Sequence, residues 1–272
     1  MPHQSQPTRE VAVVDIAEHI TAITDEGNDL AEAAQRGGLD APVPTCPGWN
    51  LRDLVRHLGM VHLWAASHIA QPHDEPDYAS EGDQLADLTR FWPQLGTFWV
   101  DDPDLIEWYL QTNRNLVDSL ESAPSDVQAW TFLPAPTPLA MWARRQAHET
   151  AIHRFDAQSA TEGTSGFDPV FASDGIDEML SGFASGKRDF PVASPQAMVV
   201  HATDTGERWH VTITTTGITT VRNDGPADVT LAAHASDLYL ALWNRGDDSN
   251  LTVSGNHELL DTWHNNLRVR WS

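Results

Sequence analysis

Two histidines and one glutamate are the residues of this sequence best suited to chemistry. Glu149 and His153 are four positions apart, so on a helix they lie one turn apart on the same face. His57 lies much earlier, at the centre of a second helical pattern. Two imidazoles and one carboxylate form the ligand set of a catalytic zinc site, whose fourth position stays open. If the two helices face each other in a bundle, these three side chains hold a divalent metal ion.

Each part of this set also has an ordinary structural interpretation. His57 lies on an apolar stripe, where a histidine is more often a hydrogen-bonded core residue than a ligand. His62 points away from that stripe and is expected to be exposed. Arg145 and Glu149 are spaced for an ion pair on a solvated strip, worth only about 0.2–0.5 kcal/mol. Small residues border this row, however, and a buried carboxylate is costly unless it is paired or metal-bound.

Other catalytic motifs are absent from the sequence. His148 and His153 are five positions apart, so the HExxH motif of zinc proteases is not present. Cys46 is the single cysteine, which excludes an internal disulfide, and in VPTCPGWN it is expected to be structural or merely tolerated. There is no GxSxG nucleophile elbow and no glycine-rich phosphate loop. The chain therefore offers no obvious nucleophile of its own.

The bulk composition restricts the possible partners. The formal net charge is −23 over 272 residues, and such an acidic surface repels nucleic acid and anionic membranes. No apolar run is long enough for a transmembrane helix, and the first residues do not resemble a secretory signal. We therefore expect a cytoplasmic globular protein without nucleic-acid or membrane partners. The sequence does not predict its oligomeric state.

Hydrophobic periodicity predicts helices throughout the first part of the chain. They are expected over 10–36, over 51–70 with Asn50 as the N-cap, over 83–122 with an interruption at Pro93 and another near 101–103, and over 138–161. A polar loop is expected over 71–82. Four helices joined by loops predict an antiparallel bundle.

The second part of the chain has a different pattern. One helix is expected over 169–186, followed by strands over 197–203, 209–215, 218–222 and 229–233, the helical SDLYLALWNR, the short strand LTVSG and the closing helix NHELLDTWHNN. The predicted fold class is α+β, with a four-helix bundle over 1–165 and a small α+β domain over 166–272 that contains an antiparallel sheet.

Three stretches of the chain together resemble one known family. They are VPTCPGWNLRDLVRHLGMVHLWAA, WARRQAHETAIHRFDA and, more weakly, ADVTLAAHASDLYLALWNRG with LTVSGN. They are similar to the mycothiol-dependent maleylpyruvate isomerase family, which combines a DinB-like bundle with a sterol-carrier-like C-terminal domain. In that family a histidine of the second helix and a Glu-x-x-x-His pair of the fourth hold zinc. The resemblance implies that His57, Glu149 and His153 are the corresponding ligands.

The resemblance also implies a reaction. Coordination to Zn²⁺ deprotonates a thiol, and the expected cosubstrate is mycothiol, a small sugar thiol of actinobacteria. The thiolate would attack an electrophilic substrate, giving either cis–trans isomerisation or S-transfer. Arg145 and Arg245 are the candidate catalytic cations that would clamp an acidic substrate. Asp53 and Asp156 are expected to orient His57 and His153.

Two other functional classes remain open at this point. A metal-stabilised bundle joined to a sterol-carrier-like domain could bind an apolar ligand or a protein without catalysis. A zinc-water hydrolase on the same scaffold is the other alternative, and it would need an acid or base beside the metal. An open position beside the metal favours an enzyme, whereas a closed four-ligand site favours a binding protein.

Overall fold

The computed structural model describes residues 14–70, 100–161, 163–187 and 189–267. The loop predicted over 71–82 and the part of the predicted helical region over 83–99, with its break at Pro93, lie outside the described residues. The chain forms two compact units, one over Asp15–Gly166 and another from Phe167 onward. Each unit is described by itself.

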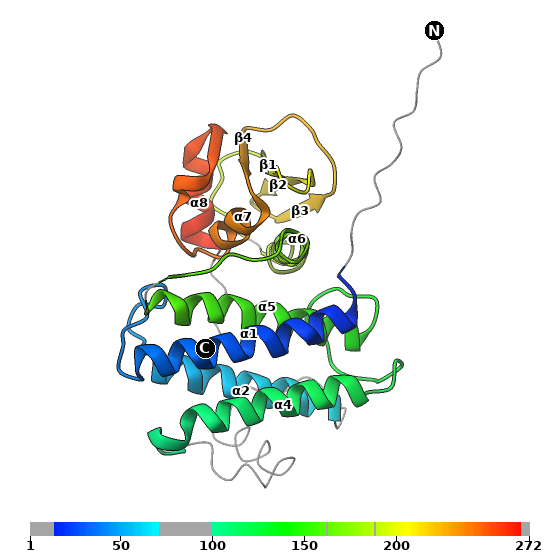
Figure 1. Cartoon of the computed structure of the whole chain (residues 1–272). Helices are drawn as coiled ribbons and strands as arrows, with labels where there is room; N and C mark the ends of the chain where they lie inside the picture. The colour runs from blue at the N-terminus through cyan, green and yellow to red at the C-terminus, as the bar shows by residue number, and fades with distance from the viewer. Residues whose placement is uncertain (1–13, 71–99, 162, 188, 268–272) are drawn as a thin grey trace. The chain divides into compact units, whose positions relative to one another are not determined.

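The first unit is a bundle of long helices, as the sequence predicts. The helices are α1 (Ile16–Gly37), α2 (Leu51–Ala70), α4 (Leu105–Ser122) and α5 (Pro138–Ser159), and a 3-10 turn, η2 (Asp102–Asp104), precedes α4. Helix α1 packs against α4 and α5, and α2 packs against the same two helices (Figure 1). Helix α2 is therefore covered on two sides, by α4 and by α5.

Side-chain caps fix where these helices begin. At the start of α1 the Asp15 carboxylate accepts a hydrogen bond from Glu18 N, and the Glu18 carboxylate accepts one from Asp15 N. Asn50 and Asp53 make the same reciprocal exchange at the start of α2, with both N···O distances at 3.0 Å. Contrary to the sequence-based expectation, Asp53 caps α2 rather than orienting His57.

Helix α5 is buried along almost its whole length although much of it is polar. Its Arg154 guanidinium donates to Glu26 on α1, to Gln158 on α5 and to the backbone oxygen of Ser165. Burial of a charged side chain is tolerated only when its hydrogen bonds are satisfied in this way. Arg154 thus fixes α5 against α1 and against the chain that follows α5.

The second unit is built around a five-stranded sheet. Its strands are β1 (Gln196–Ala202), β2 (Arg208–Thr214), β3 (Gly217–Val221), β4 (Val229–Ala233) and β5 (Thr252–Gly255). The spatial order is β3-β2-β1-β4-β5, and the β1–β4 pair is parallel while the other pairs are antiparallel. The α+β class and the mostly antiparallel sheet are confirmed, and among the described strands the parallel β1–β4 pair is the exception. The chain between β3 and β4 places β4 beside β1 rather than beside β3.

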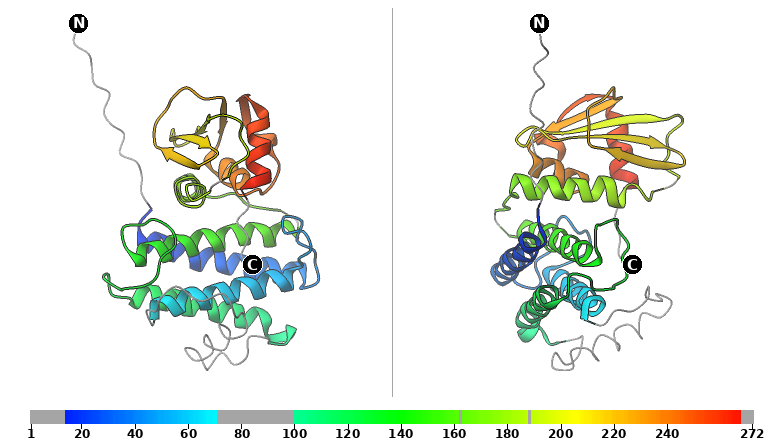
Figure 2. Two further views of the ribbon diagram at one scale, coloured as in Figure 1. Left: turned by 180° about the vertical axis from the view of Figure 1, so that it is seen from behind. Right: turned by 90° about the vertical axis from the view of Figure 1, so that its right-hand side faces the viewer.

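Helices flank this sheet. They are α6 (Pro169–Asp177), which continues into a π-helical turn, η3 (Glu178–Phe183), α7 (Ala235–Leu242), a 3-10 turn, η4 (Asp248–Asn250), and α8 (His257–Asn266). Figure 2 shows α6, α7 and α8 gathered on one face of the sheet, as a layered α+β unit requires.

The contact between α2 and α4 at Gly59 yields a test of this packing. A Cβ added at Gly59 would lie 2.3 Å from the Trp108 ring. Alanine gains about 1 kcal/mol of helix propensity over glycine, but overpacking costs about 1–3 kcal/mol, and this separation is far too short to accommodate. We expect Gly59→Ala to lower the melting temperature by about 3–6 °C. Gly186→Ala is the control, because its added Cβ meets no atom within 4 Å; equal melting temperatures for the two variants would contradict this packing.

Candidate metal centre

The three residues singled out by their chemistry converge between α2 and α5. His57 lies in the middle of α2, and Glu149 and His153 lie one turn apart on α5. The Glu149 Oε1 atom is 3.3 Å from His153 Nε2 and 3.7 Å from His57 Nε2. The three candidate ligand atoms lie within 4.8 Å of one another. Two helices distant in sequence thus bring one carboxylate and two imidazoles to a single point.

The two oxygens of Glu149 have different surroundings. Oε2 accepts a hydrogen bond from Arg145 Nη2 at 2.7 Å, with both side chains buried. Oε1 is buried and makes no hydrogen bond of normal geometry, although it faces both histidine Nε2 atoms. A buried carboxylate oxygen without a donor is costly. A divalent cation bound by Oε1 and the two nitrogens would remove that cost, so these residues fit the metal that the ligand set implies.

Without a metal, the charges of this cluster are strongly coupled. Burial would raise the pKa of Glu149, but Arg145, His153 and His57 hold it well below its ordinary value. Burial would lower the pKa of His153, but hydrogen bonds to Asp156 and Glu149 raise it to about 9. His153 therefore carries a proton at neutral pH, and a metal ion must displace that proton when it binds.

Asp156 fixes the orientation of His153. The His153 Nδ1 atom lies 2.9 Å from Asp156 Oδ2, and the Asp156 side chain is fully buried. With Nδ1–H donated to the carboxylate, Nε2 faces Glu149, the arrangement usual for a histidine that ligates a metal. The expectation that Asp156 orients His153 agrees with this geometry.

A tight loop before α2 contacts both histidines, one directly and one through Asp156. The Trp49 ring lies edge-on to His57 with ring centroids 5.0 Å apart, and Cys46 Sγ donates to Asp156 Oδ2 at 3.3 Å. Backbone hydrogen bonds between residues 43 and 49 close the loop. The sequence indicated a proline-bracketed turn but not its contact with Asp156, because nothing local specifies a partner 110 positions away.

The two candidate catalytic arginines lie in different units. Arg145 is buried on α5 against Glu149, next to the predicted ligands. Arg245 follows α7 in the second unit, where its Nη1 donates to the backbone oxygen of Trp243 at 3.0 Å. The clamping of a substrate by either arginine stays a prediction.

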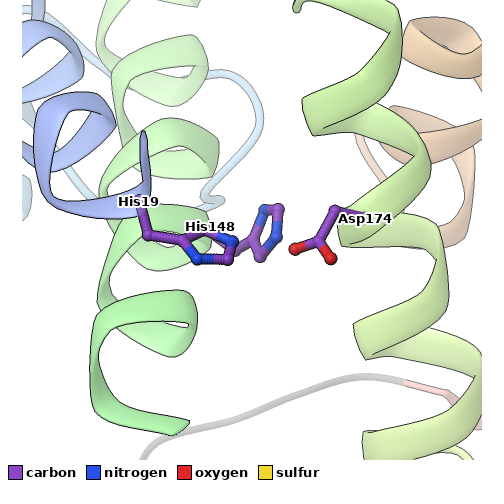
Figure 3. A group of neighbouring side chains, drawn as sticks. All are labelled: His19, His148 and Asp174. Carbon is purple, nitrogen blue, oxygen red and sulfur yellow. The ribbon is translucent and has the colours of Figure 1, made fainter. Parts of the chain in front are cut away.

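His148 faces away from the ligand set, as its position on the helix predicts. Its ring lies beside His19 of α1, with centroids 6.0 Å apart and an edge-on orientation. Figure 3 shows these two histidines on their neighbouring helices; Asp174, drawn in the same view, belongs to α6 of the other unit. His148 is therefore not part of the His57 cluster.

The expectation that His62 is exposed is wrong. His62 is fully buried, its Nε2 lies 3.0 Å from Thr150 Oγ1 on α5, and its ring stacks on Tyr109 of α4. The Thr150 hydroxyl donates to the Gln146 backbone oxygen, so His62 Nε2 is the donor in the first contact. Helix α2 is covered by both α4 and α5, so side chains outside its apolar stripe are buried as well.

Both units of the chain match models of one known family. Residues 20–158 match the family model described as the mycothiol maleylpyruvate isomerase N-terminal domain, and residues 171–262 match the MDMPI C-terminal domain. The chain belongs to this family. A crystal structure of the mycothiol-dependent maleylpyruvate isomerase is similar at 12% identity and a TM-score of 0.58, covering 88% of this chain and 93% of that one. A histidine-to-alanine mutant of that enzyme gives 11% identity and a TM-score of 0.59, with the same coverage.

At such low identity, the similarity to these family members establishes the fold alone. The chain has no significant match among curated proteins. Among the described helices, none is both long and apolar enough to cross a membrane.

The convergence of the three ligands predicts metal binding that depends on Asp156. Protein purified without an affinity tag should contain about one Zn²⁺ per chain by elemental analysis. Asp156→Asn should lower the affinity for Zn²⁺ about 10- to 100-fold in a chelator competition, because the orienting carboxylate is lost. Asp53→Asn, which changes a carboxylate that only caps α2, should leave the affinity unchanged. Equal affinities of the two variants would show that Asp156 does not position His153.

The buried His62 predicts acid sensitivity. Burial lowers its pKa from 6.5 to about 3, so between these values only the unfolded chain takes up the proton. The free energy of unfolding therefore falls as the pH drops through this window, by about 2 kcal/mol between pH 6.5 and 5 from this residue. Urea unfolding at the two pH values should show this loss reduced by about that amount in His62→Gln. His234→Gln, at a side chain that is 74% exposed, should keep the wild-type pH dependence.

Proposed function

We propose that this protein is a zinc-dependent enzyme that activates a low-molecular-weight thiol, mycothiol, for attack on a small electrophilic substrate. The observation that carries the proposal is the buried Oε1 of Glu149, which lies 3.3 Å from His153 Nε2 and 3.7 Å from His57 Nε2. Membership of the family supports the choice of thiol, because the solved enzymes of similar fold are named as mycothiol-dependent maleylpyruvate isomerases. A cytoplasmic location is part of the same proposal.

When bound, the metal supplies Lewis acidity that keeps a thiol deprotonated at neutral pH. The protein sets the charge of the site. Two neutral imidazoles and one carboxylate bring a single negative charge, and the buried Arg145 guanidinium offsets it from the other side of Glu149. His57, Glu149 and His153 would hold the ion with little negative charge of their own, and an ion held in this way would favour binding of a thiolate.

The remaining side chains hold this geometry. Asp156 accepts the Nδ1 proton of His153 and so keeps Nε2 directed at the ligand point. The edge of the Trp49 ring restrains His57. The thiolate sulfur then forms a bond to an electrophilic carbon of the substrate. In an isomerisation, the π electrons of the attacked double bond would move onto a conjugated carbonyl, the bond would rotate, and return of the electrons would expel the thiolate. In an S-transfer, the carbon next to the attacked one would take up a proton, or the attacked carbon would lose a leaving group, and the thioether would remain.

Arginine side chains are the candidates for recognition of an acidic substrate. A dicarboxylate would need cationic partners, and Arg145 and Arg245 are the candidates. Because the Arg145 guanidinium already pairs with Glu149, we assign it chiefly to the ligand and leave the substrate clamp to Arg245. The rival zinc-water hydrolase would need Asp156 as an acid or base, but this carboxylate faces the Nδ1 side of His153.

Two single substitutions test the mechanism. His153→Ala should abolish turnover while the circular dichroism spectrum stays near that of the wild type, because the bundle core is mainly apolar. Cys46→Ala should keep activity within a few-fold, because no protein thiol acts as nucleophile. Turnover is read with mycothiol and a panel of electrophiles, by mass spectrometry for thioethers and by chromatography for isomers. An active His153→Ala enzyme together with an inactive Cys46→Ala enzyme would overturn the mechanism.

Omitting the thiol separates the proposed enzyme from its rivals. The proposal requires that no product form without mycothiol. Hydrolysis products that appear without thiol would support the zinc-water hydrolase. A metal-loaded protein that converts none of the electrophiles, with or without thiol, would support a binding protein.

A further inference from the structure

Three donor atoms converge on the side of His153 that faces away from Glu149. They are Cys46 Sγ, His153 Nδ1 and Asp156 Oδ2, which all lie within 4.8 Å of one another. The sulfur is 3.3 Å and the nitrogen 2.9 Å from the carboxylate oxygen. We propose that Cys46, His153 and Asp156 form a second cation site, selective for thiophilic divalent ions such as Cd²⁺. This site uses the opposite ring nitrogen of His153 and does not depend on the proposed function.

The spacing of the donors suits an ion. With the bond lengths of Zn²⁺, about 2.3 Å to sulfur and about 2.0–2.1 Å to nitrogen and oxygen, tetrahedral angles place sulfur about 3.5 Å and nitrogen about 3.3 Å from oxygen, and the larger Cd²⁺ spreads the donors somewhat further. The present separations are shorter than these by only about 0.2–0.4 Å, which is within the reach of small side-chain rotations. The hydrogen-bonded arrangement is therefore close to a preformed ligand set.

The exchange of protons for the ion is balanced. The ion gains bonds to the thiolate, to Nδ1 and to the carboxylate, and the Cys46 thiol proton and the His153 Nδ1 proton go to solvent. A proton on His153 Nε2 stays in place and faces Glu149 Oε1, 3.3 Å away. One thiolate and one carboxylate then neutralise the two charges of the ion.

The sulfur donor of Cys46 makes the second site selective for soft metal ions. A thiolate ligand favours soft ions, whereas the His57 set contains only nitrogen and oxygen donors. Cys46 is half-buried and offers a route of entry, while Asp156 is fully buried and strengthens the electrostatic attraction. Both candidate sites use the His153 ring. A soft ion bound through Nδ1 therefore leaves Nε2 protonated, and Nε2 cannot then bind an ion together with His57 and Glu149.

Cadmium binding tests the proposal directly. The full-length protein is stripped of metal with a chelator and titrated with Cd²⁺, and thiolate-to-cadmium charge-transfer absorption is recorded in the ultraviolet. Cys46 is the only cysteine, so any such band reports this residue. We expect a band in the wild type and in His57→Ala, which lacks a ligand of the first set. Cys46→Ser, which keeps a hydrogen-bond donor for Asp156, should fold normally by circular dichroism and show no band.

The other two donors are tested by affinity. Asp156→Asn and His153→Ala should each weaken cadmium binding at least tenfold, whereas the control Asp53→Asn should not change it. Cd²⁺ should also slow alkylation of Cys46 by iodoacetamide in the wild type, and much less in Asp156→Asn. The proposal is overturned if the wild type shows no thiolate band, if His57→Ala loses the band, or if Asp156→Asn and His153→Ala titrate with the same affinity for Cd²⁺ as the wild type.

Discussion

The interior of the bundle holds a buried carboxylate, Glu149, whose two oxygens have different partners. Arg145 takes the first oxygen of Glu149, and the second is left facing His57 and His153 in a place that water cannot easily reach. A carboxylate in such surroundings is stable only with positive charge beside it. Protonated His153 supplies that charge in the metal-free chain, and a divalent ion would supply it more completely. Arg145, His153 and Asp156 on α5, together with the loop before α2, contact this carboxylate or the histidines beside it.

Supporting a buried polar site places demands on the whole helix that carries it. Helix α5 brings Arg145, Glu149, His153, Arg154 and Asp156 into the interior, and each is engaged by a side chain of opposite or complementary character. Arg154 with Glu26 repeats, on the α1 side, the pairing that Arg145 makes with Glu149 on the α2 side. Replacing one member of either pair would leave a buried charge without a partner. The resulting loss of folding stability is far larger than the net stability that the intact pair contributes.

Local patterns predicted the helices and strands, and the i,i+4 spacing together with the family resemblance singled out His57, Glu149 and His153, which the structure brings together. Helix α2 and the capping role of Asn50 follow directly from periodicity and cap chemistry. Local patterns could not predict the contacts between segments that are distant in the sequence. The burial of His62 depends on α4 and α5 covering α2 together, and the parallel β1–β4 pair depends on a long connection. The Cys46–Asp156 contact likewise depends on how a loop meets another helix.

The contact at Gly59 also bears on the candidate metal centre. Gly59 lies two positions after His57, and the Trp108 ring of α4 occupies the space that a side chain would need. Because Gly59 has no side chain, the α2 backbone lies directly against the Trp108 ring, and this contact helps to position the helix that carries His57. The distance between His57 on α2 and Glu149 on α5 thus depends in part on the apolar contact of Gly59 with Trp108, which involves no candidate ligand. Substitutions on α4 at this contact are therefore expected to change the distance between His57 and Glu149 while every candidate ligand is kept.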